Sequence, residues 1–364
     1  MLRVLQIVTY MGRGGLETML MNYYRHIDRN KVQFDFLVHR DFEADYDSEI
    51  KALGGRIYHI SRLIPWSVKY RKELKHFFGE HPEYKIVHVH QDCLSSVALQ
   101  CAKECGVPVR IAHSHNSSQD RNLKYLIKLH YMKKIPAFAT NLFACSKAAG
   151  RWMFGESGSF QVLNNAIDVD RYRYSPSEDK NVREELNLGN SIIIGHVGRF
   201  DSQKNHEFLI DIFFECQKRN PDLKLVLVGD GIGREKIRKK VQNMNIQDKV
   251  IFTGIRSDVY RLMQAMNVFV FPSLYEGLPV TMIEAQASAL PCVISDHVSE
   301  ECIVTEGLVT VKKLDESPAE WAEHILQCIN QKRQDHICEV KASGYDIKTE
   351  AKRLEELYLQ KEEE

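Results

Sequence analysis

The sequence has no long apolar run and no excess of charge of either sign. No stretch approaches the ~18 consecutive apolar residues of a membrane span, and the opening residues 1–8 are too short for a signal peptide and predict a first strand. The formal net charge is zero, so charge alone does not point to nucleic acid. We therefore expect a globular, cytoplasmic protein without a nucleic-acid partner.

The cysteines also lack any regular arrangement. There are nine, an odd number without paired C-x-x-C spacing, and Cys101 and Cys105 are merely one helical turn apart. This pattern argues against a disulfide framework and against structural zinc. At 364 residues the chain is too long for one ordinary core, so we expect two domains.

The first half, residues 1 to about 168, alternates strand and helix patterns, which predicts a parallel sheet. Its first strand, 2–8, ends in a turn containing Gly12, Gly14 and Gly15 and is followed by a helix from 16 to about 27. This order brings backbone N–H groups close to a phosphate. The glycine spacing differs from the dinucleotide fingerprint, so we consider an NAD site the weaker interpretation.

Histidines gather where two predicted strands of this half end. His88 and His90 flank the end of the strand at 86–90, and His113 and His115, followed by Asn116, come after the strand at 109–112. Ligands of parallel sheets lie beyond the carboxyl ends of the strands, so these side chains are placed to meet a substrate. A metal site at His113 and His115 lacks a carboxylate at suitable spacing, and we predict none.

Residues 121–136 are basic, amphipathic and rich in Tyr, Leu and Ile. The default interpretation is a helix whose apolar face packs on its own domain. The sharper hypothesis is a patch that holds the protein at a membrane surface, near a lipid-linked acceptor. Changing Lys124, Lys128, Lys133 and Lys134 would test it.

The second half begins after a polar turn that ends at Asp168. Its first strand, 192–196, runs into a loop with Gly198, Arg199 and Lys204 before a predicted helix at 206–218. A forked guanidinium and a compact ammonium could together neutralise a diphosphate leaving group without a metal. We therefore favour a functional role for this loop over a merely solvated one.

The stretch 271–291 carries two carboxylates, Glu276 in a loop and Glu284 in the helix that follows it. Pro279 lies where the first helical turn would begin. The carboxylates should be roughly 10–12 Å apart along the axis, with the free N–H groups of a helix start between them as a seat for an anion. This arrangement suits a nucleotide-sugar, although helix propensity alone could also explain it.

Two further strand ends complete the candidate site. Gly229 opens a glycine run after the strand at 223–228, where close backbone approach is permitted. Gly254 and Arg256 follow the strand at 250–253, in a turn suited to contacting a flat base through its main chain.

These residues carry a family resemblance that covers almost the whole chain. The second half resembles the donor domain of the GT-B retaining glycosyltransferases of family 4, and the first half agrees more loosely. The segment 112–116 and the tail 294–321 look closest to members that build capsular or exopolysaccharide. The matching signals are Gly198-Arg199, Lys204-Asn205, Gly229-Asp230-Gly231, Gly254, Pro272-Ser273 and the E-x7-E pattern from Glu276 to Glu284 with Ala285, Ala287 and Pro291, together with Gly14-Gly15-Leu16-Glu17 and Asn165-Ala166-Ile167-Asp168.

The resemblance implies an α/β GT-B fold with two Rossmann-like domains facing each other across a cleft. The acceptor domain would comprise 1–168 plus a final helix, 346–364, that crosses back to it, and the donor domain 169–345. The nucleotide-sugar is then a substrate, and no cofactor or metal is required.

The resemblance also implies a role for each matching residue. Arg199 and Lys204 would hold the diphosphate, Glu284 the ribose hydroxyls, and Glu276 the transferred sugar. His115, or His113 because the alignment is ambiguous by about two residues, would contact the donor sugar. The remaining contacts are implied for two segments. The loop Gly14-Gly15 would close over phosphate and acceptor, and backbone N–H groups from the segment Gly277, Leu278, Pro279 and Val280, in which proline has none, would reach the sugar or phosphate.

The chain departs from the family pattern at three places. Ala166 and Ala289 stand where glycine is common, and we expect local backbone shifts there rather than loss of activity. The segment Ser295-Asp296-His297 lacks the usual glycine-rich turn, which leaves that part of the site open.

We therefore expect a metal-independent, retaining hexosyltransferase that moves a sugar, most simply from a UDP-sugar, to a glycan or polyprenyl-linked acceptor. It would work in the cytoplasm, at or near the inner face of the membrane. The alternatives are a nucleotide-sugar epimerase of the same fold, which needs no acceptor, and a non-catalytic sugar-nucleotide-binding subunit.

Overall fold

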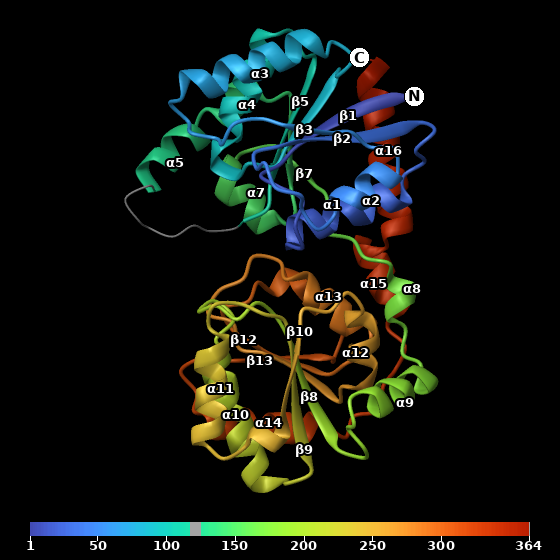
Figure 1. Ribbon diagram of the computed structural model, residues 1–364. Coiled ribbons are helices and arrows are strands. Elements are labelled where there is room, and N and C mark those ends of the chain that lie inside the picture. Colours follow the sequence, from blue (N-terminus) through green and yellow to red (C-terminus); the bar gives the residue numbers. More distant parts are fainter. Residues whose placement is uncertain (117–124, 364) are drawn as a thin grey trace. The chain divides into compact units, whose positions relative to one another are not determined.

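The computed structural model describes residues 1–116 and 125–363 and divides the chain into two compact units (Figure 1). Unit 1 comprises Met1–Ile167 and Asp346–Glu364, and unit 2 comprises Asp168–Tyr345. Residues 121–124 of the basic amphipathic stretch, including Lys124, lie outside the described residues. Within the described ranges, every helix is too short or too polar to cross a bilayer.

Unit 1 is built on a parallel sheet of seven strands in the order β3-β2-β1-β4-β5-β6-β7. The strands are β1 (Leu2–Ile7), β2 (Val32–Val38), β3 (Ile57–His59), β4 (Ile86–Val89), β5 (Val109–Ser114), β6 (Asn141–Ala144) and β7 (Gln161–Val162). The helices are α1 (Gly15–His26), α2 (Asp47–Ala52), α3 (Val68–Glu80), α4 (Ser95–Glu104), α5 (Tyr125–Met132), α6 (Ile135–Phe138), α7 (Lys147–Phe154) and α16 (Ile347–Glu363).

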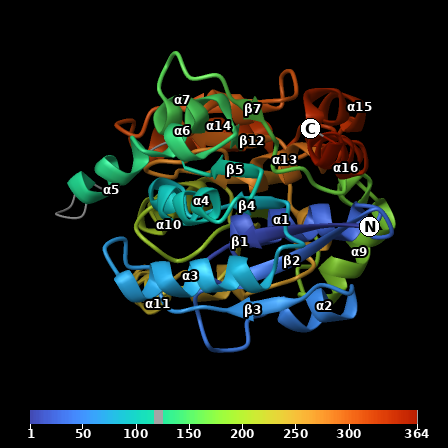
Figure 2. The ribbon, with the colours of Figure 1, turned by 90° about the horizontal axis from the view of Figure 1, so that it is seen from above.

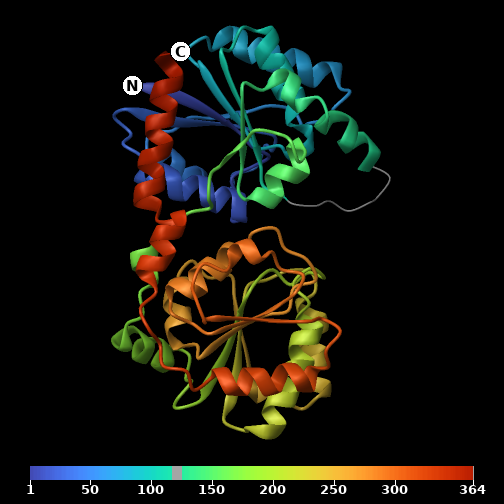
Figure 3. The same ribbon diagram turned by 180° about the vertical axis from the view of Figure 1, so that it is seen from behind.

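The last helix, α16, belongs to unit 1 although it ends the chain (Figure 3). It packs beside α1 and buries Leu354 and Tyr358 in the same core as Phe34 of β2. The backbone N–H of Ile347 donates to Ile167 O at 2.9 Å, so the two segments of unit 1 meet where the chain leaves and re-enters it. The expected final helix, 346–364, starts at Ile347, three residues after Gly344 breaks the helical path with φ 81°.

Unit 2 contains a parallel sheet of six strands in the order β10-β9-β8-β11-β12-β13. The strands are β8 (Ile192–Val197), β9 (Leu223–Val228), β10 (Val250–Gly254), β11 (Val268–Phe271), β12 (Cys292–Ser295) and β13 (Val309–Lys312). The helices are α8 (Val169–Tyr172), α9 (Pro176–Glu185), α10 (His206–Arg219), α11 (Arg234–Asn243), α12 (Val259–Ala265), α13 (Val280–Ala287), α14 (Pro318–Cys328) and α15 (Ile337–Val340).

Both sheets confirm the α/β prediction, and both have a point where the strand order reverses. In unit 1 the chain moves outward on either side of the β1–β4 pair, and in unit 2 on either side of the β8–β11 pair. Ligands of open parallel sheets bind outside the carboxyl ends of the strands at such points. The loops after β1, β4, β8 and β11 are therefore where a site is expected, and they carry most of the candidate residues.

Candidate active site

In unit 2, Lys204 and Glu276 form an ion pair although 72 residues separate them in sequence. Lys204 Nζ lies 2.6 Å from Glu276 Oε1, and the two side chains are only 16% and 8% exposed. Lys204 Nζ also lies 4.5 Å from the centre of the Phe271 ring at the end of β11. The loops after β8 and β11 thus present a shielded cation and a shielded carboxylate side by side.

The glycines of unit 2 hold these loops close together. A Cβ on Gly229, which has φ 134°, would lie 2.1 Å from Gly198 O, and a Cβ on Gly231 would lie 2.7 Å from Phe200 O. Phe200 N donates to Asp230 O at 3.0 Å, which joins the loop after β9 to the loop that leads to Lys204. Glycine at positions 229 and 231 therefore allows the loop after β9 to lie close to the neighbouring loop of the protein.

Helix α13 begins next to Glu276 without a side-chain cap. Pro279 is its N-cap, one position earlier than the first-turn place that the sequence predicts, and its side chain makes no capping hydrogen bond. Within that turn the hydroxyl of Thr281 is buried and makes no hydrogen bond to any described group, and the same holds for Ser273 after β11. An uncapped helix start with unsatisfied hydroxyls beside it can receive an anion.

Glu284, on α13, is held by a residue that sequence reasoning missed. The hydroxyl of Tyr172 in α8 donates to Glu284 Oε1 at 2.6 Å. Burial raises the pKa of the Glu284 carboxyl and that of the Tyr172 phenol. The second carboxylate oxygen of Glu284 remains available to a ligand, and a tyrosine 112 positions away in sequence could be found only from the fold.

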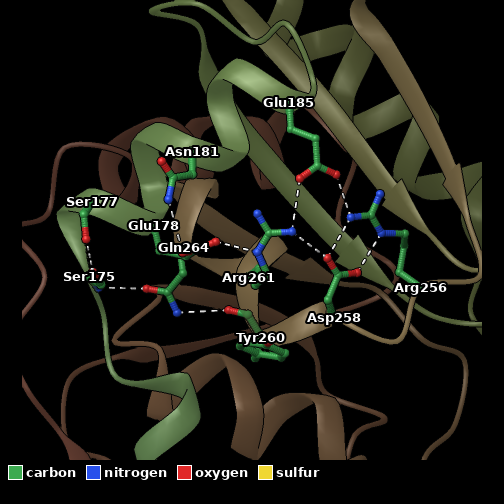
Figure 4. A network of polar contacts seen from close by, with 10 residues as sticks. All are labelled: Ser175, Ser177, Glu178, Asn181, Glu185, Arg256, Asp258, Tyr260, Arg261 and Gln264. Carbon is green, nitrogen blue, oxygen red and sulfur yellow. Dashed lines mark hydrogen bonds and ion pairs between the residues drawn. The ribbon is translucent and has the colours of Figure 1, made fainter.

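Arg199 and Arg256, the two arginines of the predicted site, differ in their exposure and in their hydrogen-bond partners. Arg199 is 74% exposed, and its nearest carboxylate is Asp201 at 3.8 Å. The guanidinium of Arg256 instead donates to Asp258 and Glu185 in a network that joins α9 to α12 (Figure 4). The side chain of Arg256 therefore stabilises unit 2, which leaves only its main chain for the predicted contact with a base.

In unit 1, four histidines form an array on one face of the sheet. His88 and His90 are stacked along β4 with ring centres 4.3 Å apart, and His113 and His115 along β5 with centres 4.0 Å apart. Hydrogen bonds join the strands: His88 Nε2 to His113 Nδ1 at 3.2 Å, and His90 Nδ1 to His115 Nε2 at 2.9 Å. Burial lowers the pKa of all four rings, for His115 to about 3, so they are neutral near pH 7.

The partners of His90 determine which nitrogen of His115 carries the proton. Gln6 Oε1 lies 2.9 Å from His90 Nε2 and can only accept, so His90 Nε2 must carry its proton. His90 Nδ1 is then an acceptor, and His115 Nε2 must donate to it. His115 Nδ1 is left as a buried acceptor without a partner among the described residues.

Ring orientation argues against a metal at this array. One ligand nitrogen each of His88, His90 and His113 lies within 4.8 Å of the others, close enough to suggest an ion site. An imidazole binds a metal through a lone pair in its ring plane, but His88 and His90 are stacked with planes only 29° apart. Both cannot direct lone pairs at one ion, so hydrogen bonding and stacking account for the cluster.

The remaining candidates of unit 1 lie at the same edge of the sheet. Gly14 is the N-cap of α1 and Gly15 its first residue, with no side-chain cap. Asn116 is exposed, and its Nδ2 donates to Asp92 Oδ2 at 3.3 Å.

The sequence was also compared with protein families and with known proteins. Residues 177–343 match "Glycosyl transferases group 1" and residues 13–171 match "Glycosyltransferase Family 4". The chain is 37% identical over 370 residues to a Bacillus subtilis (strain 168) protein designated glycosyltransferase EpsF, covering 98% of this chain and 96% of that protein.

The chain belongs to glycosyltransferase family 4. A second family member, the capsular polysaccharide biosynthesis glycosyltransferase CapH of Staphylococcus aureus, is 25% identical over 375 residues and covers 99% of both chains. The Anabaena protein HepE, solved in complex with UDP, superimposes with a TM-score of 0.82 at 19% identity, covering 99% of this chain and all of HepE. The predicted GT-B fold of this family is thereby confirmed.

Proposed function

We propose that this family 4 glycosyltransferase is a retaining, metal-independent enzyme of capsular or exopolysaccharide assembly that transfers a hexose from a UDP-sugar to a lipid-linked glycan. The observation that carries the proposal is the shielded Lys204–Glu276 pair beside the uncapped start of α13. The complex of HepE with UDP supports the choice of nucleotide, and the name of CapH supports the pathway.

The chemistry assigned to the pair follows from its charges. As the bond between sugar and diphosphate breaks, negative charge grows on the leaving phosphate, and Lys204, Arg199 and the free amides of α13 would stabilise it. Glu276 holds Lys204 in place before the donor arrives and then accepts hydrogen bonds from hydroxyls of the transferred sugar. Glu284, oriented by Tyr172, would bind the ribose, and His115 Nδ1 would accept from a sugar hydroxyl.

Retention would arise by front-face displacement. The leaving phosphate helps to remove the proton of the acceptor hydroxyl, so no side chain need act as a strong base. Since the cations and amides neutralise the diphosphate, the step requires no divalent ion.

The decisive experiment measures transfer from a panel of nucleotide-sugars in EDTA, with the anomeric configuration of the product read by NMR. We expect undiminished turnover in EDTA and retained configuration. Inverted product would overturn the proposed mechanism, and epimerised sugar nucleotide formed without acceptor would identify an epimerase.

Variants at the pair test the site itself. Lys204→Ala should weaken UDP binding and lower kcat by about 100- to 1,000-fold, whereas Glu276→Gln should lower kcat and leave UDP binding largely intact. The matched control is Lys218→Ala on the surface of α10, where Lys218 Nζ pairs with Glu215 at the same 2.6 Å. Full activity in both site variants would reject this assignment.

A further inference from the structure

Apart from Met1, Tyr10 and Phe42, the exposed large apolar side chains in the described part of unit 1 lie on two segments. In the connection from β3 to α3, Ile64 and Trp66 are 41% and 66% exposed, and Val68, the first residue of α3, is 66% exposed. On α5, Leu126 and Ile127 are 75% and 38% exposed. Isolated exposed apolar residues are ordinary, but a group that includes a tryptophan marks a surface that binds something apolar.

Helix α5 is unusual in its own right. Six of its eight residues, in the sequence Tyr-Leu-Ile-Lys-Leu-His-Tyr-Met, are apolar or aromatic, yet none of the eight is buried. A helix of this composition ordinarily buries an apolar stripe against its own domain. Tyr131 and Met132 at its end pack against the core of unit 1, as the default expectation for the stretch 121–136 has it, whereas Leu126 and Ile127 are left exposed.

Cations predominate beside both segments, although Lys69 pairs with Glu73 of α3 at 3.6 Å. Arg62, Lys69 and Lys72 are exposed next to the first segment, and Lys133 and Lys134 are exposed at the end of α5. Neither residues 61–72 nor residues 125–140 include an aspartate or glutamate. The partner of this surface should therefore be both apolar and anionic.

The two segments lie on the same side of unit 1 (Figure 2). Helices α3 and α5 both pack against α4, and Arg71 at the start of α3 donates to Gln100 of α4 at 3.0 Å. Both segments also follow carboxyl ends of strands, β3 and β5, at the edge that carries His115 and the Gly14-Gly15 loop.

We propose that residues 62–72 and 125–134 form a membrane-docking face, in which Trp66, Val68 and Leu126 enter the headgroup region and the flanking cations bind anionic lipid. Aromatic and aliphatic side chains between lysines and arginines are typical of proteins that lie on a bilayer. A second copy of the chain fits less well, because a twofold contact would set this cationic surface against itself. The proposed function enters only in the role given to docking, which is to bring a lipid-linked acceptor to this edge of the sheet.

The test measures binding of the full chain to phosphatidylcholine vesicles with and without phosphatidylglycerol, by flotation and by tryptophan fluorescence. We expect binding that requires phosphatidylglycerol and weakens with salt. The blue shift should come mainly from exposed Trp66, since Trp321 is already buried and Trp152 is half-buried. The double variant Trp66→Ser/Leu126→Ser, and separately Lys133→Glu/Lys134→Glu, should each weaken binding at least tenfold.

Unit 2 supplies matched controls. Ile232 is 99% exposed, so Ile232→Ser removes an apolar side chain that is more accessible than Trp66. Lys239→Glu on α11 reverses one exposed charge. Absence of binding to anionic vesicles, or an equal loss in these controls, would overturn the proposal, as would a self-association of the chain that the Trp66→Ser/Leu126→Ser change abolishes.

Failure of the membrane-docking proposal can be told apart from failure of the proposed function. The docking variants should keep full transfer to a water-soluble acceptor analogue and lose it only with acceptor embedded in vesicles. If Lys204→Ala were fully active, the proposed donor site would fail while vesicle binding stood, and failure of vesicle binding would leave transfer to the soluble analogue intact.

Discussion

The tautomer of His115 is set by a chain of two hydrogen bonds, from His115 to His90 and from His90 to Gln6. Its Nδ1 is an acceptor because His90 takes the proton of Nε2, and His90 can do so because Gln6 Oε1 accepts from its other nitrogen. Gln6 is placed on β1 opposite His88, where the parallel register brings it to the array. A hydroxyl that meets His115 Nδ1 must therefore donate.

Gln6→Met should change the tautomer of His115. Methionine has similar bulk but offers His90 no strong acceptor, and an unsatisfied buried N–H costs about 1–3 kcal/mol. His90 can avoid this cost by moving its proton to Nδ1, which forces His115 to carry its proton on Nδ1.

Nitrogen-15 NMR of histidine-labelled protein, with His115→Gln for assignment, reads this change directly. The wild type should show an unprotonated Nδ1 at His115 and the variant a protonated one. Gln33→Met is the control, because Gln33 is also a buried amide of unit 1 but donates to Leu53 O. A protonated Nδ1 in the wild type would contradict the assignment.

At the scale of elements, helix α13 ends in a way that the sequence does not favour. Leu290 N donates to Ala285 O and Ala289 N to Gln286 O, the pattern that closes a helix around a left-handed residue. That residue is Ala289, with φ 54°. Ala289 thus adopts a conformation that glycine adopts without strain, and the expected local shift of backbone relative to the family stays a prediction.

Ala289→Gly should therefore stabilise the protein. The left-handed conformation costs a residue with a Cβ about 1–2 kcal/mol, and the greater freedom of glycine in the unfolded chain offsets about 0.4–1 kcal/mol of that gain. We expect a rise of about 0.5–1 kcal/mol in the free energy of unfolding, measured by denaturant titration. The same substitution inside the helix, Ala287→Gly, should lower it by about 1 kcal/mol, and equal signs for the two would refute the argument.

At the scale of the whole molecule, most of the architecture follows from the sequence, because alternating strand and helix patterns leave few topologies for parallel sheets. The loops of the candidate site were predictable for the same reason, since they follow strand ends. Partners from distant elements were not: Tyr172 meets Glu284 across 112 positions, and Tyr358 meets His88 at 2.6 Å across 270. Such contacts depend on packing that local patterns do not encode.

Stability should fall as the pH drops below 6.5. The pKa values of His88, His90 and His113 lie well below 6.5 in the folded protein because burial disfavours the charged rings. Their contribution is therefore present above the unfolded value and is lost as the pH falls toward the folded values. Each ring costs up to about 1.4 kcal/mol per pH unit, so these three alone cost about 4 kcal/mol between pH 7 and pH 5.5. Buried His39, His115, His196 and His206, whose pKa values are also lowered, add to the loss.

Denaturant unfolding at pH 7 and pH 5.5 checks this, together with the protons taken up on unfolding. His113→Phe should reduce the loss by about 1 kcal/mol, the contribution of one ring. An unfolding free energy that stays constant or rises over this range would show that the rings are already protonated in the folded state.

The placement of α16 has a consequence for how the protein is made. Unit 1 needs the final residues of the chain to cover its sheet, whereas unit 2 is complete at Tyr345. During synthesis, unit 2 can finish folding while the first-made unit still lacks a helix. Unit 1 can therefore close its core only after α16 has emerged from the ribosome.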